Sequence, residues 1–100
     1  MIPEIKRHYS YFTSVEISET DSSGVVLGAM DLTGASAWFV VEEKEFQAVV
    51  ATPPTLGQVS IDMTPVDTAS LDRGRRSAWF KVVVGGETNY YGEHYIEVID

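Results

Sequence analysis

Residues 77–99 read SAWFKVVVGGETNYYGEHYIEVI, and the expected fold is built around them. A run of aromatic and β-branched residues leads to Gly85-Gly86, and a second run rich in Tyr and Val follows. Two such runs joined by two residues that tolerate positive φ are a strong signal for a β-hairpin. With the turn at this glycine pair, Phe80 faces Tyr91 across the hairpin. The first run is apolar on both faces, so its strand is expected inside the sheet.

Alternation of apolar and polar residues predicts further strands on the N-terminal side of this hairpin. Residues 5–17 read as one long strand whose apolar side chains occupy odd positions. Residues 58–64 read as a half-buried strand that Pro65 closes. The other elements expected here are a loop at residues 18–24 and strands at residues 25–32 and 35–41.

One segment has a different periodicity. Phe46, Val49 and Val50 stand at helical spacing and follow a group of acidic residues, which suits the positive end of a helix dipole. A residue before proline avoids the α region, so Thr52-Pro53 ends the pattern. The sequence therefore predicts one short helix near residues 43–51.

These elements predict a single α+β domain over residues 1–100. Its sheet is expected to be mostly antiparallel, with five to six strands, and to curl towards a barrel. An all-β sandwich, in which the helix is a loop instead, is the alternative. A chain with 44 % hydrophobic residues has enough apolar material for one core.

Charge and composition restrict the classes of partner. Fifteen acidic residues against seven basic ones give a net charge of −8. This balance opposes direct binding to nucleic acid or to anionic lipid, and it suits a basic protein partner. There is no cysteine, no apolar run spans a bilayer, and the N-terminal residues lack the order of a signal peptide. We therefore expect a soluble cytoplasmic protein, whose charge serves solubility first.

No pattern of catalytic or metal-binding residues stands out. The histidines, His8 and His94, are far apart in sequence, and His94 points to the opposite side of a strand from Glu93. No phosphate-binding, dinucleotide-binding or nucleophile motif is present, and the acidic residues lack the spacing of a calcium loop. The sequence thus predicts no catalytic residue, no cofactor and no metal site.

Residues 64–76 form the longest segment without a strand pattern, and one turn of helix is expected around residues 68–71. Long loops inside compact domains are uncommon and often functional. Arg73, Arg75 and Arg76 place three of the seven basic residues in this acidic chain close together. Arginine is enriched at interface hot spots, so these residues are candidate partner contacts. Pairing with the chain's own acidic residues is an equal alternative.

Tyrosines gather near the two ends of the chain, and tyrosine suits either an interface or the rim of a core. If the first and last strands pair, one face of that pair would present an aromatic patch. The candidate partner contacts in this group are Tyr9, Tyr11, Tyr91 and Tyr95.

The tetrapeptide SAWF occurs twice, at residues 36–39 and at residues 77–80, and each copy opens a Val-rich strand. The residues that follow the two copies differ, and a four-residue match is weak beside true repeat signatures. We interpret the echo as a composition shared by two strand starts.

Three hypotheses about function remain open. The first is a non-catalytic protein-binding module, within which an inhibitor or immunity-type protein that blocks a basic surface fits the charge. The second is a structural subunit of an oligomer or of a phage-like particle. The third is a small-ligand binder or enzyme with a pocket under the helix, lined by Trp38, Trp79 and His94. Of these we favour the first, with another protein, or a second copy of this chain, as the partner.

Overall fold

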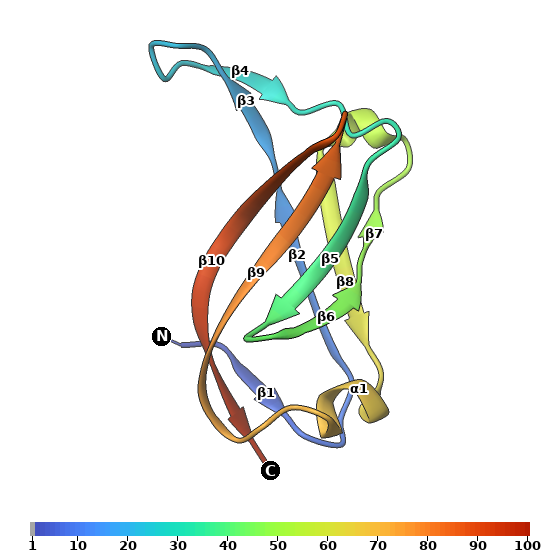
Figure 1. The fold of residues 1–100 in the computed structure, drawn as a ribbon, viewed down its shortest axis with the longest axis vertical. Coiled ribbons are helices and arrows are strands. Elements are labelled where there is room, and N and C mark those ends of the chain that lie inside the picture. Colours follow the sequence, from blue (N-terminus) through green and yellow to red (C-terminus); the bar gives the residue numbers. More distant parts are fainter. Residues whose placement is uncertain (1) are drawn as a thin grey trace.

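The computed structural model describes residues 2–100, and most of them lie in strands (Figure 1). The strands are β1 (Glu4–Lys6), β2 (Tyr11–Glu16), β3 (Ser18–Thr20), β4 (Val26–Ala29), β5 (Ser36–Val41), β6 (Lys44–Gln47), β7 (Val49–Val50), β8 (Gln58–Met63), β9 (Gly74–Val84) and β10 (Glu87–Ile99). The helical elements are a 3-10 turn, η1 (Pro54–Leu56), and one short α-helix, α1 (Pro65–Ala69).

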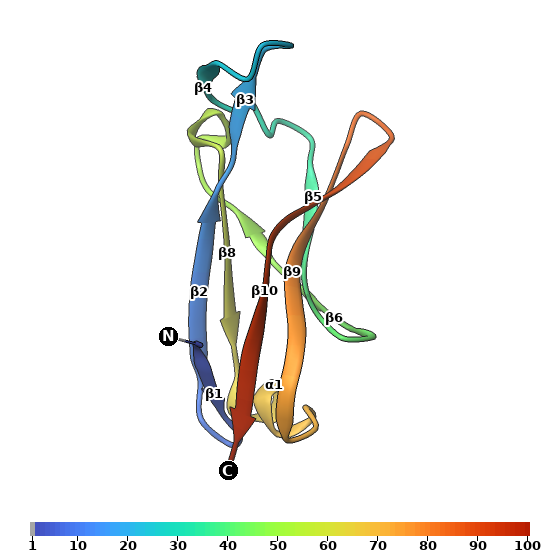
Figure 2. The ribbon, with the colours of Figure 1, turned by 90° about the vertical axis from the view of Figure 1, so that its left-hand side faces the viewer.

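The strands form two facing layers and one separate ribbon. The larger sheet has the order β1-β10-β9-β5-β6, and the smaller one has the order β2-β8-β7. Figure 2 shows these two sheets as the layers of the molecule. Only Ala48 separates β6 from β7, and its N–H donates to the carbonyl of Ala37 at 2.9 Å. The chain thus passes from one sheet into the other there, and the whole arrangement curls.

The C-terminal hairpin agrees with its prediction. Phe80 pairs with Tyr91, and Gly85 and Gly86 both have positive φ, at 60° and 81°. Two left-handed residues in the turn match the twist of the flanking strands. β9 lies in the middle of the larger sheet, which confirms the position expected from its apolar faces.

The core lies between the two layers. Phe39 and Phe80 stand opposite each other on β5 and β9, with ring centroids 5.1 Å apart. β8 contributes Val59, Ile61 and Met63 from the facing sheet, and all three are buried. The alternation of residues 58–64 therefore predicted both the strand and its buried side correctly.

The predicted helix near residues 43–51 is wrong. β6 pairs with β5 along this segment, with Phe46 opposite Phe39, and β7 follows directly. Glu42 takes a positive φ of 53° and makes the tight turn that leads back along β5. Helical spacing in so short a segment yields to a ladder with a neighbouring strand, because isolated short helices are not stable. The fold is therefore mostly β rather than α+β. The larger sheet is mixed, because β1 pairs with β10 in parallel, while its other pairs and those of the smaller sheet are antiparallel.

Several boundaries in the N-terminal half also differ from expectation. Residues 5–17 do not form one strand, because His8 has a φ of 72° in a turn and the chain changes sheet there. Part of the expected loop at residues 18–24 is β3, and the expected strand at residues 25–32 shortens to β4. Together β3 and β4 form a hairpin that projects beyond the two sheets (Figure 1).

The loop between β8 and β9 is shorter than predicted. Helix α1 begins just after β8, earlier than the turn expected around residues 68–71, and β9 begins at Gly74. Thr64 caps the helix: its hydroxyl accepts from the N–H of Asp67, whose carboxylate accepts in return from the N–H of Thr64. Such a reciprocal box satisfies two donors at a helix start.

The two ends of the described chain meet at one edge of the larger sheet. β1 pairs with the end of β10 in parallel, with Ile5 opposite Val98, and both side chains are buried. The first and last strands are therefore neighbours, although Tyr9 and Tyr11 lie beyond β1.

Within the described residues, no helix has the length and apolar character needed to cross a membrane.

Candidate functional site

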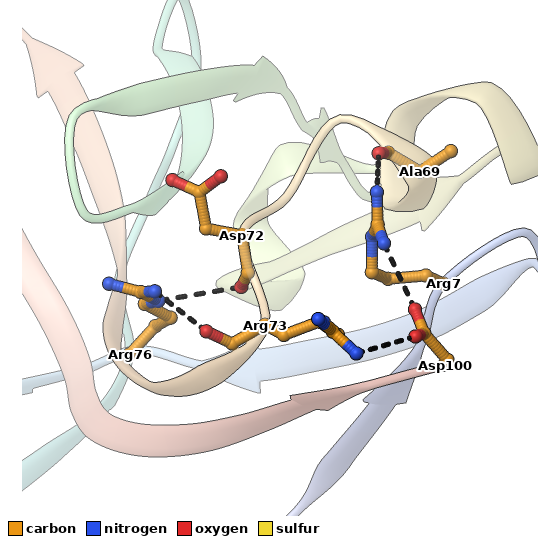
Figure 3. A network of polar contacts seen from close by, with 6 residues as sticks. All are labelled: Arg7, Ala69, Asp72, Arg73, Arg76 and Asp100. Carbon is orange, nitrogen blue, oxygen red and sulfur yellow. Dashed lines mark hydrogen bonds and ion pairs between the residues drawn. The ribbon is translucent and has the colours of Figure 1, made fainter.

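The arginines of the β8–β9 connection are largely engaged within the chain. Arg73 forms an ion pair with Asp100 at 3.0 Å, and Arg7 binds the other oxygen of that carboxylate at 2.9 Å (Figure 3). Arg7 also donates to the carbonyl of Ala69 at 3.0 Å. The hydrogen bond from Arg7, helped by the charge of Arg73, lowers the pKa of Asp100 although desolvation opposes it. This network ties the loop to both ends of the chain.

The other two arginines differ from each other. The Arg76 guanidinium donates to the carbonyl of Arg73 at 2.7 Å and to that of Asp72 at 3.4 Å, so it braces the loop (Figure 3). Arg75 is exposed on β9, where it stands opposite Glu97 in the ladder. Among residues 2–100, Arg75 is the one of these three arginines without a side-chain hydrogen bond or ion pair, so it is available for an outside contact.

The predicted tyrosines fall into two groups. Tyr11 packs its ring 6.5 Å from that of Phe39, and Tyr91 donates its hydroxyl to the sulfur of Met30 at 3.8 Å. These two line the core. Tyr9 and Tyr95 are exposed, with the ammonium of Lys6 lying 4.8 Å from the Tyr9 ring centroid. The structure does not bring these four side chains together into one patch.

A different aromatic surface lies on the outer face of the larger sheet, the face turned away from the smaller sheet. Alternation along the strands puts Trp38 of β5, Trp79 of β9, and Tyr90 and Tyr95 of β10 on this face. Tyr90 and Tyr95 are 60 % and 61 % exposed, and both tryptophans are partly exposed. We call this set of four residues the outer aromatic face.

Within the outer aromatic face, Trp79 and Tyr90 form the walls of a small cleft. Their ring centroids are 6.1 Å apart and their planes meet at 84°. Glu93 completes the lining of the cleft, whose volume is about 210 Å³. Two aromatic walls and a carboxylate thus surround one small space.

A β-bulge positions Glu93 in that lining. Tyr91 pairs with Phe80 but His94 pairs with Ala78, so Gly92 and Glu93 both lie across from Trp79. Gly92 has a φ of 66°, which a glycine adopts without strain. Glu93 was not among the site residues predicted from the sequence. The available signal was Gly92 itself, since a glycine inside a strand often marks a bulge.

A larger cleft of about 310 Å³ lies between the β5–β6 turn and the start of β9. It is lined by Val41, Glu42, Glu43, Lys44, Leu71, Asp72 and Arg76. The Lys44 ammonium crosses to the carbonyl of Ser70, and Glu42 accepts from the N–H of Ser77 at 3.3 Å. These contacts between charged side chains and backbone hold the β5–β6 turn against the loop that follows α1 and against β9 itself.

The structure does not reproduce the predicted pocket under a helix. That helix is absent, and of the three expected lining residues only Trp79 borders either cleft. His8 lies in the β1–β2 turn, and His94 contacts the carbonyl of Gly92 through its Nδ1. Within residues 2–100, no three histidine or acidic side chains are arranged to hold a metal ion.

Comparisons with known proteins bear on the fold. No protein-family model matches the chain, and no curated protein matches its sequence. Among solved structures, the N-terminal domain of phage TP901-1 ORF48 is similar, with a TM-score of 0.62 and 16 % sequence identity. The match covers 100 % of this chain and 86 % of that one. The chain therefore shares its fold with this phage domain.

Proposed function

We propose that this chain is a non-catalytic protein-binding module that docks on its partner through the outer aromatic face. The observation that carries this proposal is the exposure of two tyrosines beside two tryptophans on one side of a sheet. Aromatic residues are enriched in protein interfaces. A large apolar ring with a polar tip suits a surface that is exposed to water in the free protein and buried in the complex.

The charge of the chain favours a basic partner. With a net charge of −8, the chain attracts a positively charged surface and accelerates encounter with it. An inhibitor or immunity-type role, in which the module covers a basic functional surface, is the finer form of this proposal. Arg75 and Glu97, opposite each other next to Tyr95, would lie at the rim of such a contact.

Two matched variants test the surface. The partner is first isolated from the native host with the immobilised chain, identified by mass spectrometry and produced in pure form. Tyr95→Glu should then weaken binding about tenfold or more, because it puts a charge where the partner would cover the tyrosine ring in the complex. Phe12→Glu is the control, since Phe12 is 65 % exposed on β2 of the other sheet. Equal loss in both variants, or affinity for the partner that does not fall as salt rises, would contradict the proposal.

A second candidate is a structural subunit of a phage-like particle. The solved neighbour is itself a phage domain, and the feature of this chain that favours assembly is the β3–β4 hairpin. That hairpin exposes Val25, Val26 and Leu27 on a ribbon that stands clear of the sheets (Figure 1). Exposed apolar side chains on a projecting ribbon are suited to insertion into a neighbouring subunit.

Sedimentation velocity over a range of concentrations tests this candidate. Wild-type chain should associate as its concentration rises, and the double variant Val26→Ser/Leu27→Ser should stay monomeric because it lacks the apolar ribbon. A wild-type chain that remains a monomer at the highest concentration would remove self-assembly from consideration.

A further inference from the structure

We propose that the cleft between Trp79, Tyr90 and Glu93 receives an arginine side chain of the partner protein. This inference deepens the proposed function and rests on it for the partner's basic character. It is carried by a second site on the same face of the sheet, where the chain's own lysine lies between a tryptophan and a carboxylate.

The occupied site lies at Trp38. The Lys81 ammonium is 4.7 Å from the centroid of the Trp38 ring and 2.7 Å from a carboxylate oxygen of Glu45. A cation over an indole face is attracted by the quadrupole of the ring, and a nearby carboxylate adds an ion pair. The sheet face therefore holds one complete group of tryptophan, carboxylate and cation.

The two SAWF segments relate this group to the cleft. They pair antiparallel about Phe39 and Phe80, which stand opposite each other. A local two-fold axis through that pair exchanges Trp38 with Trp79 and keeps both on the outer face. The echo that appeared in the sequence as a coincidence of composition thus places two tryptophans in related positions on the sheet. The carboxylates beside them, Glu45 and Glu93, come from positions that the axis does not exchange.

The position that supplies the cation is different at the second site. Trp38 has Lys81 directly opposite on the neighbouring strand, whereas Trp79 has Val40. Valine cannot supply a charge. The cation–π contacts within residues 2–100 are those of Lys6 with Tyr9 and of Lys81 with Trp38. Lys81 stands opposite Tyr90 on the same face, but its ammonium is turned to Trp38 and Glu45. Within residues 2–100, Trp79 therefore has a carboxylate beside it, from Glu93, but no cation over its ring.

The shape and size of the cleft select the ligand. About 210 Å³ is less than the roughly 300–1,000 Å³ typical of small-molecule pockets, so one side chain suits it better than a whole ligand. The rings at 84° form a corner, and a planar group can stack on one wall while its edge reaches the carboxylate. Guanidinium is planar, more weakly hydrated than ammonium, and forms forked bonds to carboxylates. These properties favour arginine over lysine.

The experiment uses two peptides that differ in charge alone. One contains four arginines separated by glycines, and the other has citrulline, the neutral isostere, at each arginine position. Two-dimensional NMR of the ¹⁵N-labelled chain follows the indole N–H signals, so that Trp79 reports on the cleft and Trp38 serves as an internal control. We expect the arginine peptide to shift the Trp79 signal saturably and the citrulline peptide to bind about tenfold more weakly.

Variants assign the effect to the cleft. Tyr90→Ser and Glu93→Gln should each weaken the arginine peptide about fivefold or more. Glu16→Gln removes one negative charge from an exposed position on β2, and it should change the affinity less than about twofold. Glu93→Gln and Glu16→Gln change the net charge equally, so the difference between them isolates the contribution of the cleft.

The outcomes separate this inference from the proposed function. If the arginine peptide binds equally to all three variants, or shifts Trp38 and not Trp79, the inference is overturned while a basic partner stays in place. The peptide could instead bind at Trp79 as expected while the identified partner is acidic and binds the chain with an affinity insensitive to salt. The proposed function would then fail, but the assignment of the cleft as an arginine-binding site would stand. Equal binding of the citrulline peptide would remove the role of the cation.

Discussion

At the residue scale, Gly57 is the position where the fold tolerates no side chain. It has a φ of 66° and follows η1, and its carbonyl accepts from the N–H of Ile17 at 2.7 Å. A Cβ built there would lie 2.6 Å from the carbonyl oxygen of Ile17 and 2.9 Å from the nitrogen of Met30. Both are backbone atoms, so no side-chain rotation can relieve the clash.

We therefore expect Gly57→Ala to lower the free energy of unfolding by roughly 2–5 kcal/mol, because left-handed strain and overpacking add together. Gly24→Ala is the matched control, since Gly24 also has positive φ, at 84°, but a Cβ there meets nothing within 4 Å. It should cost about 1 kcal/mol from strain alone. Urea denaturation of both variants measures the difference, and equal losses would mean that the backbone around Gly57 moves easily.

Asp100 gives the chain a pH-dependent contribution to stability. Its pKa is lowered in the folded state, chiefly by the hydrogen bond from Arg7. A depressed carboxyl pKa stabilises the fold at pH values above the ordinary pKa of about 3.9, and this stabilisation is lost as the pH falls through the folded-state value. Asp100→Asn should lower the free energy of unfolding at neutral pH. It should also make that free energy fall less steeply as the pH is lowered.

Urea midpoints measured at a series of pH values would test this expectation. Asp62→Asn is a suitable control, because Asp62 is exposed on β8 and is absent from the ion pairs seen in residues 2–100. If Asp100→Asn followed the wild-type pH profile unchanged, the ion pair with Arg7 would contribute nothing to folding.

At the scale of elements, sequence patterns predicted the central strands and failed where the chain bends. β8 and β9 follow from alternation and apolar content because they face a core along their whole length. The kink at Ala48 divides residues 44–50 between two sheets, and the resulting spacing of Phe46 and Val49 imitates a helix. No local rule distinguishes these cases, because the ladder with β5 that decides between them is a tertiary contact.

The candidate site was missed for a similar reason. The hairpin register was predicted correctly up to Tyr91, but a regular ladder would place Gly92 alone across from Trp79. The bulge adds Glu93 there, and with it the carboxylate of the cleft. The significance of the SAWF echo also depended on pairing between β5 and β9, which lie about forty residues apart in the chain and have no turn between them to set their register.

The elements should also differ in what they contribute to stability. Leu27→Ser on the projecting β3–β4 hairpin should change the free energy of unfolding by less than about 0.5 kcal/mol, because Leu27 is 64 % exposed. Ile96→Ala on β10 should cost about 2–5 kcal/mol, because Ile96 is fully buried in the core. Urea denaturation compares the two, and a large loss for Leu27→Ser would show that the hairpin packs against the body in solution.

At the scale of the whole molecule, β1 brings the beginning of the described chain to the edge of the larger sheet, beside the end of β10. Ile5 lies opposite Val98, the N–H of Glu97 donates to the carbonyl of Pro3 at 2.9 Å, and Arg7 binds Asp100. These contacts join residues more than ninety positions apart in sequence. Topologies rich in such distant contacts fold slowly, since the loop must close before its contacts form.

β1 also covers the edge of β10 over residues 97–99, and an uncovered strand edge is a template for pairing with another chain.

Removal of residues 2–6 should therefore have two effects. The free energy of unfolding should fall by about 2 kcal/mol or more, because the fully buried side chain of Ile5 leaves the core. The shortened chain should also associate through the exposed edge of β10, with a sedimentation coefficient that rises with concentration. Ile5→Ala separates the two effects, since it removes the buried side chain but leaves the β1 backbone in place against β10. That variant should lose comparable stability and sediment like the wild type. If it associated as strongly as the shortened chain, destabilisation of the fold rather than exposure of the strand edge would be the cause of association.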